Sequence, residues 1–365
     1  MKRILFLGQF PPPFHGVSVM NSYIINSELI LSNYNLDIVD LKFSTSIKNL
    51  RKISPGKIFK VLYYGYQIVK KVLTKKPDIV YFIIVPTGLP FYRDAFYVML
   101  LKLFKCKIVF HLHGKGIKNE AGKSSFKKHL YRWVFKDTYV ICLSDHLTGD
   151  ISEVYRSKPF IVPNGIKVQP VFNRIADRSD EFPPQILYLS HYLRNKGILV
   201  LIDALAILHN QGFLFNARLV GEPADLKIEF LEQQINNKNL SEVVKVIGPQ
   251  YGDNKSLEFQ NADIFVLPTY NDVFGLVNLE AMQYKLPVIS TFEGSIPDVV
   301  IDNVTGFLVE TQNPQMLADK IAILLNNKDL RIEMGMKGFE RFMNDYTLTQ
   351  FFEKLNNTFQ TILKN

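Results

Sequence analysis

Twelve short apolar runs, separated by longer amphipathic stretches, set the strongest constraint on how this chain can fold. The runs of the first half are RILFLG, LDIVDL, DIVYFIIV, KIVFHLHG, TYVICLS and PFIVPNG, and those of the second half are QILYLS, NARLVGE, VVKVIG, ADIFVLP, LPVIS and GFLVE. Strands that are apolar on both sides are typical of parallel sheets covered by helices on both faces. The pattern therefore predicts an α/β protein with two doubly wound, Rossmann-like domains, one in each half.

The chain of 365 residues is long enough for two domains with separate cores. Periodicity is lost between the halves, where polar residues and prolines gather in IKVQPVFNRIADRSDEFPP. We therefore expect an N-terminal domain over residues 1–166, a linker over 167–184 and a C-terminal domain over 185–344. Residues 345–365 have the pattern of a last amphipathic helix with no strand after it, and we expect this helix to return to the N-terminal domain.

Composition argues against several classes of protein. Cys106 and Cys142 stand in apolar surroundings without the spacing of a zinc site or a disulfide framework, so we expect a reducing, cytoplasmic compartment. The apolar run from Ile4 to Leu7 is too short for a signal peptide. No segment approaches the roughly 18 uncharged apolar residues of a spanning helix. The expectation is a protein that is soluble or bound to one face of a membrane.

Charge is divided unevenly between the two halves. Residues 1–170 hold 26 Lys and Arg against 10 Asp and Glu, whereas residues 171–365 hold 17 against 24. The first half therefore carries +16 and the second −7, which together give the net charge of +9. Clusters such as KKVLTKK and KSSFKKHLYRWVFK favour a surface for an anionic partner over a merely solvated face. Nucleic acid, anionic lipid and phosphorylated substrates are all candidates for that partner.

Loops at the ends of predicted strands are where open α/β sheets bind ligands. The loop GQFPPPFHGVSVM follows the first strand, and its backbone at Gly16 could approach a phosphate, although it lacks the glycine spacing of a dinucleotide motif. In HLHGKG, His111 and His113 lie on the same side of a strand. No third metal ligand is evident, so His113 is better suited to bind a substrate hydroxyl or to orient an acceptor.

The stretch SHYLRNKG follows the first strand of the second half and carries two cations. Arg194 and Lys196 precede Gly197, which opens the helical stretch GILVLIDALAIL. Cations beside a glycine and a helix N-terminus suit a diphosphate. A solvated basic loop is the alternative, but the position after the first strand of a Rossmann-like unit favours phosphate binding.

The stretch NDVFGLVNLEAM places a carboxylate among apolar residues. A helix is expected from about Phe274 to Tyr284, with Glu280 on the face of Leu276. A glutamate in these surroundings needs hydrogen-bond donors or a cation, and two adjacent ribose hydroxyls would serve. The helix start also offers its first N–H groups to an anion or a sugar oxygen. Asp272 either caps this helix or takes part in ligand binding.

Together these stretches resemble the retaining glycosyltransferases of family four, which have the two-domain GT-B fold. The resemblance covers essentially the whole chain. It is strongest in LPTYNDVFGLVNLEAMQYKLPVIST, which is similar to the family's Glu-x7-Glu signature with Asp272 in the first acid position. The stretches ILYLSHYLRNKG, IVPNG, ARLVGEP, GSIPDVV and VTGFLV also match in order and spacing. The resemblance implies two Rossmann-like domains that face an interdomain cleft.

The resemblance also implies roles for individual residues. Glu280 would bind the ribose of a nucleotide-sugar, and Lys196 would contact its diphosphate. Asp272 would hold the donor sugar together with the N–H groups of Phe274, Gly275 and Leu276. The remaining implied positions are Gly16 beneath the donor phosphate, His113 facing the sugar near the reacting carbon, and Gly221, Glu222 and Gly248 lining the base pocket.

By this resemblance the chain would be a retaining, metal-independent hexosyltransferase without a cofactor. It would move a sugar from a UDP- or GDP-sugar to a glycan or lipid-linked acceptor in surface polysaccharide or glycoconjugate biosynthesis. The basic N-terminal domain would hold that acceptor at an anionic membrane surface, with the protein peripheral on the cytoplasmic face. The family's usual Gly-Arg before the lysine is Ser190-His191 here, which leaves His191 or Arg194 to supply the second phosphate contact. The usual Gly-Gly of the first loop is Gly16-Val17.

Alternatives from other classes stay open. Another GT-B enzyme, such as a nucleotide-sugar epimerase, would need more acid–base residues, and a phosphorylase would need a cofactor lysine and a much longer chain. A catalytically silent transferase-like protein is compatible with Asp272. A nucleic-acid-binding protein is disfavoured because the sequence has no RNP, KH or helix-turn-helix pattern and its acidic second half would repel phosphate backbones. We therefore expect no nucleic-acid partner.

Overall fold

The computed structural model describes residues 1–12, 16–43, 55–170 and 183–364. The chain divides into two compact units, one formed by Met1–Asn164 with Thr349–Asn365 and the other by Gly165–Leu348. The first stretch of the N-terminal unit ends at Asn164, whereas the sequence predicted a domain end at 166. Most of the expected linker, residues 171–182, lies outside the described part of the chain.

The N-terminal unit contains a six-stranded sheet in which all neighbouring strands are parallel. Its spatial order is β2-β1-β3-β4-β5-β6. The strands are β1 (Lys2–Gly8), β2 (Tyr34–Asp40), β3 (Ile79–Phe82), β4 (Ile108–Leu112), β5 (Tyr139–Cys142) and β6 (Phe160–Ile161). They coincide with the six apolar runs of the first half, so those strand predictions are confirmed.

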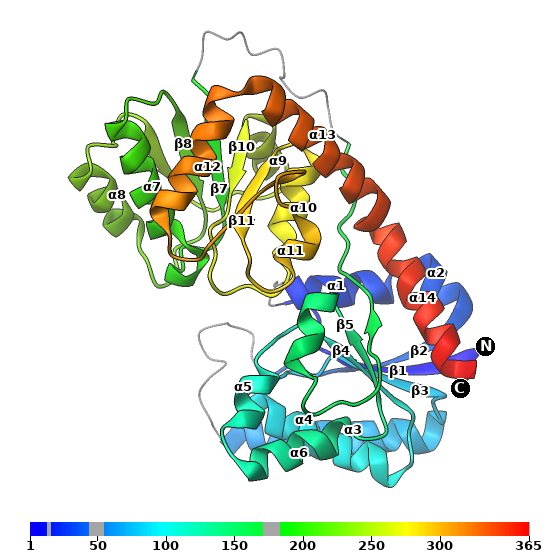
Figure 1. The fold of residues 1–365 in the computed structure, drawn as a ribbon. Helices are drawn as coiled ribbons and strands as arrows, with labels where there is room; N and C mark the ends of the chain where they lie inside the picture. The colour runs from blue at the N-terminus through cyan, green and yellow to red at the C-terminus, as the bar shows by residue number, and fades with distance from the viewer. Residues whose placement is uncertain (13–15, 44–54, 171–182, 365) are drawn as a thin grey trace. The chain divides into compact units, whose positions relative to one another are not determined.

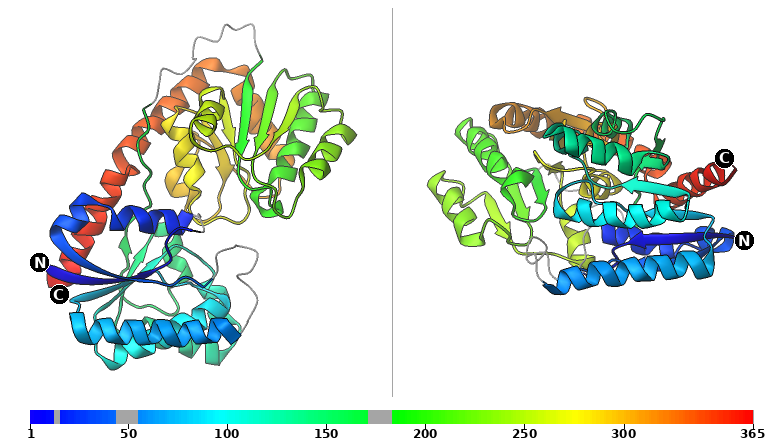
Figure 2. Two further views of the ribbon diagram at one scale, coloured as in Figure 1. Left: turned by 180° about the vertical axis from the view of Figure 1, so that it is seen from behind. Right: turned by 90° about the horizontal axis from the view of Figure 1, so that it is seen from below.

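Helices cover both faces of this sheet, as Figures 1 and 2 show. On one face, α3 (Pro55–Lys75), α4 (Gly88–Leu103) and α6 (Ser125–Phe135) lie side by side, with α5 (Ile117–Gly122) against α6. On the other face lie α1 (Gly16–Ile25), α2 (Glu28–Asn33) and the last helix, α14 (Leu348–Lys364). A short 3-10 helix, η2 (Asp145–Asp150), follows β5.

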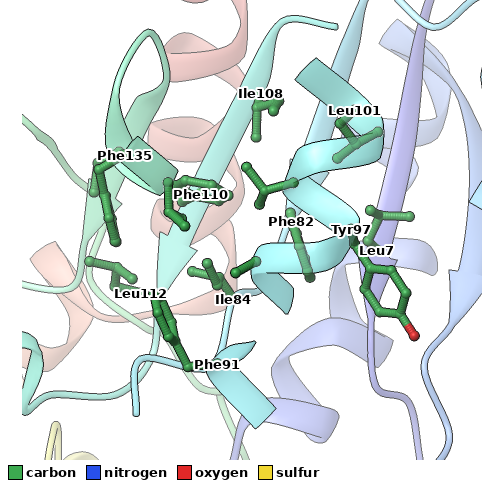
Figure 3. Close-up of a cluster of buried hydrophobic side chains, with 14 of the residues drawn as sticks. Leu7, Phe82, Ile84, Phe91, Tyr97, Leu101, Ile108, Phe110, Leu112 and Phe135 are labelled. Carbon is green, nitrogen blue, oxygen red and sulfur yellow. The ribbon is translucent and has the colours of Figure 1, made fainter. Parts of the chain in front are cut away.

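Alternate residues of the strands supply two separate buried layers. Leu7, Phe82 and Phe110 belong to the layer beneath α4, where Phe91 and Tyr97 of that helix complete the packing (Figure 3). This alternation explains why the strands are apolar throughout, because neither of their faces meets solvent.

The opposite layer joins the last helix to the N-terminal sheet. The ring of Phe359 lies 5.1 Å from that of Tyr81 and 5.7 Å from that of Tyr34. The Tyr34 hydroxyl donates a hydrogen bond to Asn356 Oδ1 (3.1 Å), and Lys107 Nζ donates to the carbonyl of Ile362 (3.1 Å). The C-terminal helix is therefore an integral part of the N-terminal unit.

The C-terminal unit contains a second six-stranded parallel sheet, with the order β12-β11-β10-β7-β8-β9. The strands are β7 (Gln185–Leu189), β8 (Asn216–Val220), β9 (Val244–Ile247), β10 (Ile264–Val266), β11 (Val288–Thr291) and β12 (Gly306–Val309). They confirm the six strand predictions of the second half. The helices are α7 (Ile198–Asn210), α8 (Ile228–Asn237), α9 (Gly252–Gln260), α10 (Leu276–Gln283), α11 (Ile296–Val299), α12 (Pro314–Asn326) and α13 (Lys328–Asp345).

The strand order of the second sheet creates a switch point beside its first strand. β7 pairs with β8 on one side and with β10 on the other, where Ile186 lies opposite Ile264. The loops that leave the carboxyl ends of β7 and β10 are therefore neighbours, and this is the place where open α/β sheets bind ligands.

Both sheets are doubly wound, which confirms the predicted α/β class. Across the described ranges, no helix combines the length and the apolar composition that crossing a bilayer requires.

Candidate functional site

The loops after β7 and β10 are joined by a shared backbone acceptor. The carbonyl of Asn195 accepts hydrogen bonds from Thr269 Oγ1 (3.0 Å) and from the Tyr270 N–H (2.9 Å). Beside it, Gly197 has a φ of +77°, and a Cβ there would lie 1.9 Å from the carbonyl oxygen of Pro268. The close approach of these two loops thus requires glycine at position 197.

Gly197→Ala is therefore expected to destabilise the fold by about 3–5 kcal/mol, because left-handed strain adds to a backbone collision. Gly212 provides a matched control, since its φ is +82° but nothing lies within 4 Å of a Cβ placed there. Gly212→Ala should lower the free energy of unfolding by only about 1 kcal/mol. Urea denaturation of both variants measures the difference, and equal losses would contradict the role of the loop contact.

The two loops bring a lysine and a carboxylate together at the switch point. Lys196, at the end of the 3-10 helix η3 (Arg194–Lys196), places Nζ 2.6 Å from Asp272 Oδ2. The other oxygen, Asp272 Oδ1, accepts the N–H groups of Val273 (2.8 Å) and Gly275 (3.3 Å). Asp272 therefore shapes the loop before α10 and also partners the lysine.

Helix α10 begins at Leu276, two residues after the expected start. Its N-cap is Gly275, whose left-handed φ of +69° ends the loop, so the suggestion that Asp272 is the N-cap residue is wrong. In the described part of the chain, the N–H groups of Phe274 and Leu276 have no acceptor. Free N–H groups at a helix start, next to a lysine, form a suitable site for an anion.

Glu280 lies on α10, one turn beyond Leu276, and has a partner that the sequence did not suggest. Both of its carboxylate oxygens lie 2.7 Å from Lys255 Nζ, which comes from α9. The two side chains are 30% and 28% exposed, so the pair is open to a ligand. Lys255 is the cation that a carboxylate in these surroundings requires. The carboxylate still has lone pairs that can accept hydrogen bonds from hydroxyl groups.

We define Arg194, Lys196, Lys255, Asp272 and Glu280 as the switch-point cluster. Removing Lys255 should disturb the orientation of Glu280 without removing a group that contacts the ligand's phosphates. For the nucleotide-sugar that the family resemblance implies, Lys255→Met is expected to raise the KM about fivefold, the effect of roughly 1 kcal/mol from a partly exposed ion pair. Steady-state kinetics should show little change in kcat, and a fall in kcat with an unchanged KM would contradict this positioning role.

The other predicted phosphate and base contacts lie around this cluster. Arg194 is exposed, its backbone N–H donates to Asp225 Oδ1 (3.0 Å), and its guanidinium lies 5.6 Å from the centroid of the Phe230 ring. His191 Nε2 lies 3.6 Å from Glu222 Oε2, and both side chains are more than half exposed. The structure therefore leaves both His191 and Arg194 accessible as the second phosphate contact.

The two predicted glycines after β8 and β9 differ in their surroundings. A Cβ at Gly221 would lie 1.9 Å from the carbonyl oxygen of Ser190, so this glycine is required by the approach of two backbones. Gly248 follows β9, and nothing lies within 4 Å of a Cβ placed there. Gly248 therefore borders open space.

Two predicted site residues belong to the N-terminal unit. Gly16 is the exposed first residue of α1, and residues 13–15 before it lie outside the described chain. His113 follows β4 and is only 9% exposed, and neither of its ring nitrogens has a partner among the described residues. Burial disfavours the imidazolium and lowers the pKa of His113 to about 3, so the ring is neutral at physiological pH.

A metal site was not expected from the sequence. Within the described ranges, no group of three or more His, Cys, Asp or Glu side chains is arranged to hold a metal ion. Independence from metals stays a prediction to be tested on the protein itself.

A known protein family matches most of the C-terminal unit. Residues 172–341 match the family described as glycosyl transferases group 1. We call residues 172–341 the group 1 segment. The group 1 segment contains the entire switch-point cluster.

Two curated relatives are similar to this chain over about half their length. An uncharacterised glycosyltransferase of Methanocaldococcus jannaschii is 28% identical over 201 residues, which cover 55% of this chain and 53% of the relative. The capsular polysaccharide biosynthesis glycosyltransferase CapM of Staphylococcus aureus is 28% identical over 177 residues, 48% of this chain and 46% of the relative. The chain thus spans about half the length of these curated relatives.

The fold extends the likeness to the whole chain. The crystal structure of Anabaena HepE in complex with UDP superposes with a TM-score of 0.76 at 20% identity, covering 99% of this chain and 100% of that one. At this level of identity the likeness concerns the fold, which is the GT-B fold predicted from the sequence.

Proposed function

We propose that this chain is a glycosyltransferase that moves a sugar from a nucleotide-sugar to a glycan or lipid-linked acceptor in polysaccharide or glycoconjugate biosynthesis. The observation that carries the proposal is the switch-point cluster inside the group 1 segment. There Lys196 pairs with Asp272 beside the free N–H groups at the start of α10, and Glu280 lies one turn along the same helix. One region thus offers donors to a diphosphate and acceptors to sugar hydroxyls.

The proposed chemistry assigns a separate task to each of these groups. Breaking the anomeric C–O bond builds negative charge on the leaving phosphate oxygen, and Lys196 with the N–H groups of Phe274 and Leu276 stabilises that charge where it develops. Glu280 accepts hydrogen bonds from the ribose hydroxyls. Asp272 accepts hydrogen bonds from the transferred sugar with the lone pairs that Lys196 and the loop leave available.

The finer features of the proposal follow the family resemblance. The donor is a UDP- or GDP-sugar carrying a hexose, the reaction retains the anomeric configuration, and no metal or other cofactor takes part. The UDP bound to Anabaena HepE supports the choice of a uridine nucleotide, and the name of CapM supports polysaccharide synthesis. Gly16 and His113 serve the donor phosphate and sugar, while Gly221, Glu222 and Gly248 line the base site.

The proposed location is the cytoplasmic face of a membrane, where a basic N-terminal unit would meet an anionic surface and its acceptor. The excess of 26 basic over 10 acidic residues in the first 170 residues supports this location.

A panel of UDP-, GDP- and ADP-sugars in a thermal-shift assay tests the donor class. One nucleotide should raise the melting temperature in the presence of a chelator as much as in its absence. If no nucleotide stabilises the chain, the proposal is wrong. If one binds but no sugar is released or transferred in any acceptor extract, the chain is a silent transferase-like protein instead.

A further inference from the structure

Three neighbouring helices of the N-terminal unit expose apolar side chains on their outer sides. Figures 1 and 2 show α3, α4 and α6 side by side over one face of the first sheet. Their inner sides are buried in the core layer of that face, through residues such as Ile68, Tyr97 and Phe135. The outer sides face away from the sheet and have no role in the donor site.

Helix α3 is apolar on two faces. At about 100° per residue, Ile68 and Val72 point to the core, while a second apolar stripe occupies an arc of about 140° elsewhere on the helix. The exposed members of this stripe are Ile58, Phe59, Leu62, Tyr63, Tyr66 and Leu73. A helix that only covered a sheet would carry polar residues along this arc.

The neighbouring helices continue the stripe. On α4 the exposed apolar residues recur at three- to seven-residue spacing, and on α6 two aromatic residues stand seven apart, so each set lies on one side of its helix. The residues are Leu89, Tyr92, Met99 and Leu103 on α4, and Phe126 and Trp133 on α6. Twelve of the 25 large apolar side chains that are exposed in the described chain lie on these three helices. Such gathering marks an interaction surface rather than scattered exposure.

The charge of the same helices is entirely of one sign at the surface. Their sequences contain ten Lys and Arg and a single acid, Asp94. Asp94 is fully buried, and its Oδ1 lies 2.7 Å from the guanidinium of Arg93. These helices therefore contribute no surface carboxylate of their own, and the acids that pair with Lys71, Lys127 and Lys128 come from neighbouring segments.

The mixture of long cations and apolar rings suits a bilayer interface. Lysine and arginine stems can lie along apolar groups while the charged ends reach phosphate headgroups. Lys102 Nζ already lies 5.0 Å from the centroid of the Trp133 ring, so a cation and an interfacial aromatic residue stand together at this surface. Helices with such faces bind in the plane of the interface without crossing it.

We propose that the outer surface of α3, α4 and α6, called here the basic apolar face, docks the protein on an anionic lipid bilayer. The inference deepens the proposed function and rests on it, because a lipid-linked acceptor requires the enzyme at the bilayer. The apolar side chains enter the headgroup region, and the lysines hold the anionic headgroups around them.

The test compares two triple variants of the full chain in vesicle co-sedimentation. The first is Phe59→Ser, Leu62→Ser and Tyr66→Ser on the basic apolar face, where the residues are 71%, 59% and 61% exposed. The control is Leu214→Ser, Tyr251→Ser and Leu257→Ser in the C-terminal unit, where they are 76%, 68% and 49% exposed. Vesicles consist of phosphatidylcholine with or without phosphatidylglycerol.

The unaltered chain and the control should bind phosphatidylglycerol vesicles equally, and both should bind pure phosphatidylcholine weakly. The α3 variant should lose roughly a hundredfold in vesicle affinity, because three large apolar groups no longer enter the interface. Equal vesicle binding by the α3 variant and the unaltered chain would overturn the inference, as would binding that ignores the anionic lipid. A dimer in gel filtration that only the α3 variant abolishes would assign the face to self-association and also overturn it.

The nucleotide thermal shift separates this inference from the proposed function. The α3 variant should keep the shift of the unaltered chain, because its substitutions lie in the other unit from the switch-point cluster. Loss of vesicle binding with an intact shift supports the docking face. An unaltered chain that binds anionic vesicles but no nucleotide would leave the docking face standing and refute the glycosyltransferase.

Discussion

Glu280→Gln is expected to weaken nucleotide-sugar binding about a hundredfold. Glutamine keeps the size of the side chain but removes the charge that strengthens its hydrogen bonds to two ribose hydroxyls. A hydrogen bond to a charged group contributes about 1.5–3 kcal/mol, so losing this charge from two such bonds corresponds to about 3 kcal/mol. Isothermal titration calorimetry with the nucleotide found in the thermal-shift panel measures the change.

The same substitution should leave the stability of the free protein nearly unchanged, because the Glu280–Lys255 pair is partly exposed. Glu333→Gln is the matched control, since Glu333 forms a comparable pair with Lys337 (2.5 Å) on α13, outside the switch-point cluster. It should bind nucleotide like the unaltered chain. Full affinity in Glu280→Gln would show that the ribose is held elsewhere.

Lys196→Met is expected to lower kcat by about a thousandfold, the upper range for removing one group that stabilises transition-state charge. The effect should fall on kcat more than on KM, because charge on the leaving phosphate oxygen is largest in the transition state. Steady-state kinetics at saturating donor measure it. A variant with unaltered kcat would remove Lys196 from the mechanism.

Two further variants show the cause of the loss of kcat in Lys196→Met. Lys238→Met breaks a lysine–aspartate pair of similar length, 2.8 Å to Asp203, away from the cluster, and should keep full activity. The double variant Lys196→Met, Asp272→Asn removes the carboxylate that Lys196→Met leaves without its cation. If the double variant recovers activity, the loss of kcat in Lys196→Met is caused by the unpaired Asp272 carboxylate and not by the missing phosphate contact.

The sheets were predictable because their physics is local. A strand that is buried on both sides must be apolar along its length. Each of the twelve strands can therefore be recognised from its own residues, without knowledge of the rest of the chain. The cations of the SHYLRNKG loop were predictable for a related reason. A loop after the first strand of a doubly wound sheet must lie at the switch point, so Lys196 could be placed before any distance was known.

What could not be predicted depends on how distant segments pack. Lys255 occurs in GDNKSLEFQ, a polar helix in which a lysine carries no particular signal, and its carboxylate partner comes 25 residues later. Only the placement of α9 beside α10 brings them together. The start of α10 was missed by two residues because the left-handed Gly275 delays the helix.

Asp272 has two structural roles that the sequence did not reveal together. Helix cap and ligand contact were set against each other, whereas one oxygen orders the loop and the other faces Lys196. A carboxylate has enough lone pairs for both kinds of contact.

The 2.6 Å pair between Lys196 and Asp272 also bears on how the proposed reaction ends. A nucleoside diphosphate has one more ionisable phosphate oxygen than the nucleotide-sugar from which it is released. Because of this extra negative charge, the product would bind an unpaired lysine more tightly than the substrate does. Asp272 competes for that lysine at every moment of the cycle. In the proposed reaction the carboxylate would therefore displace the product nucleotide from Lys196 and reduce product inhibition.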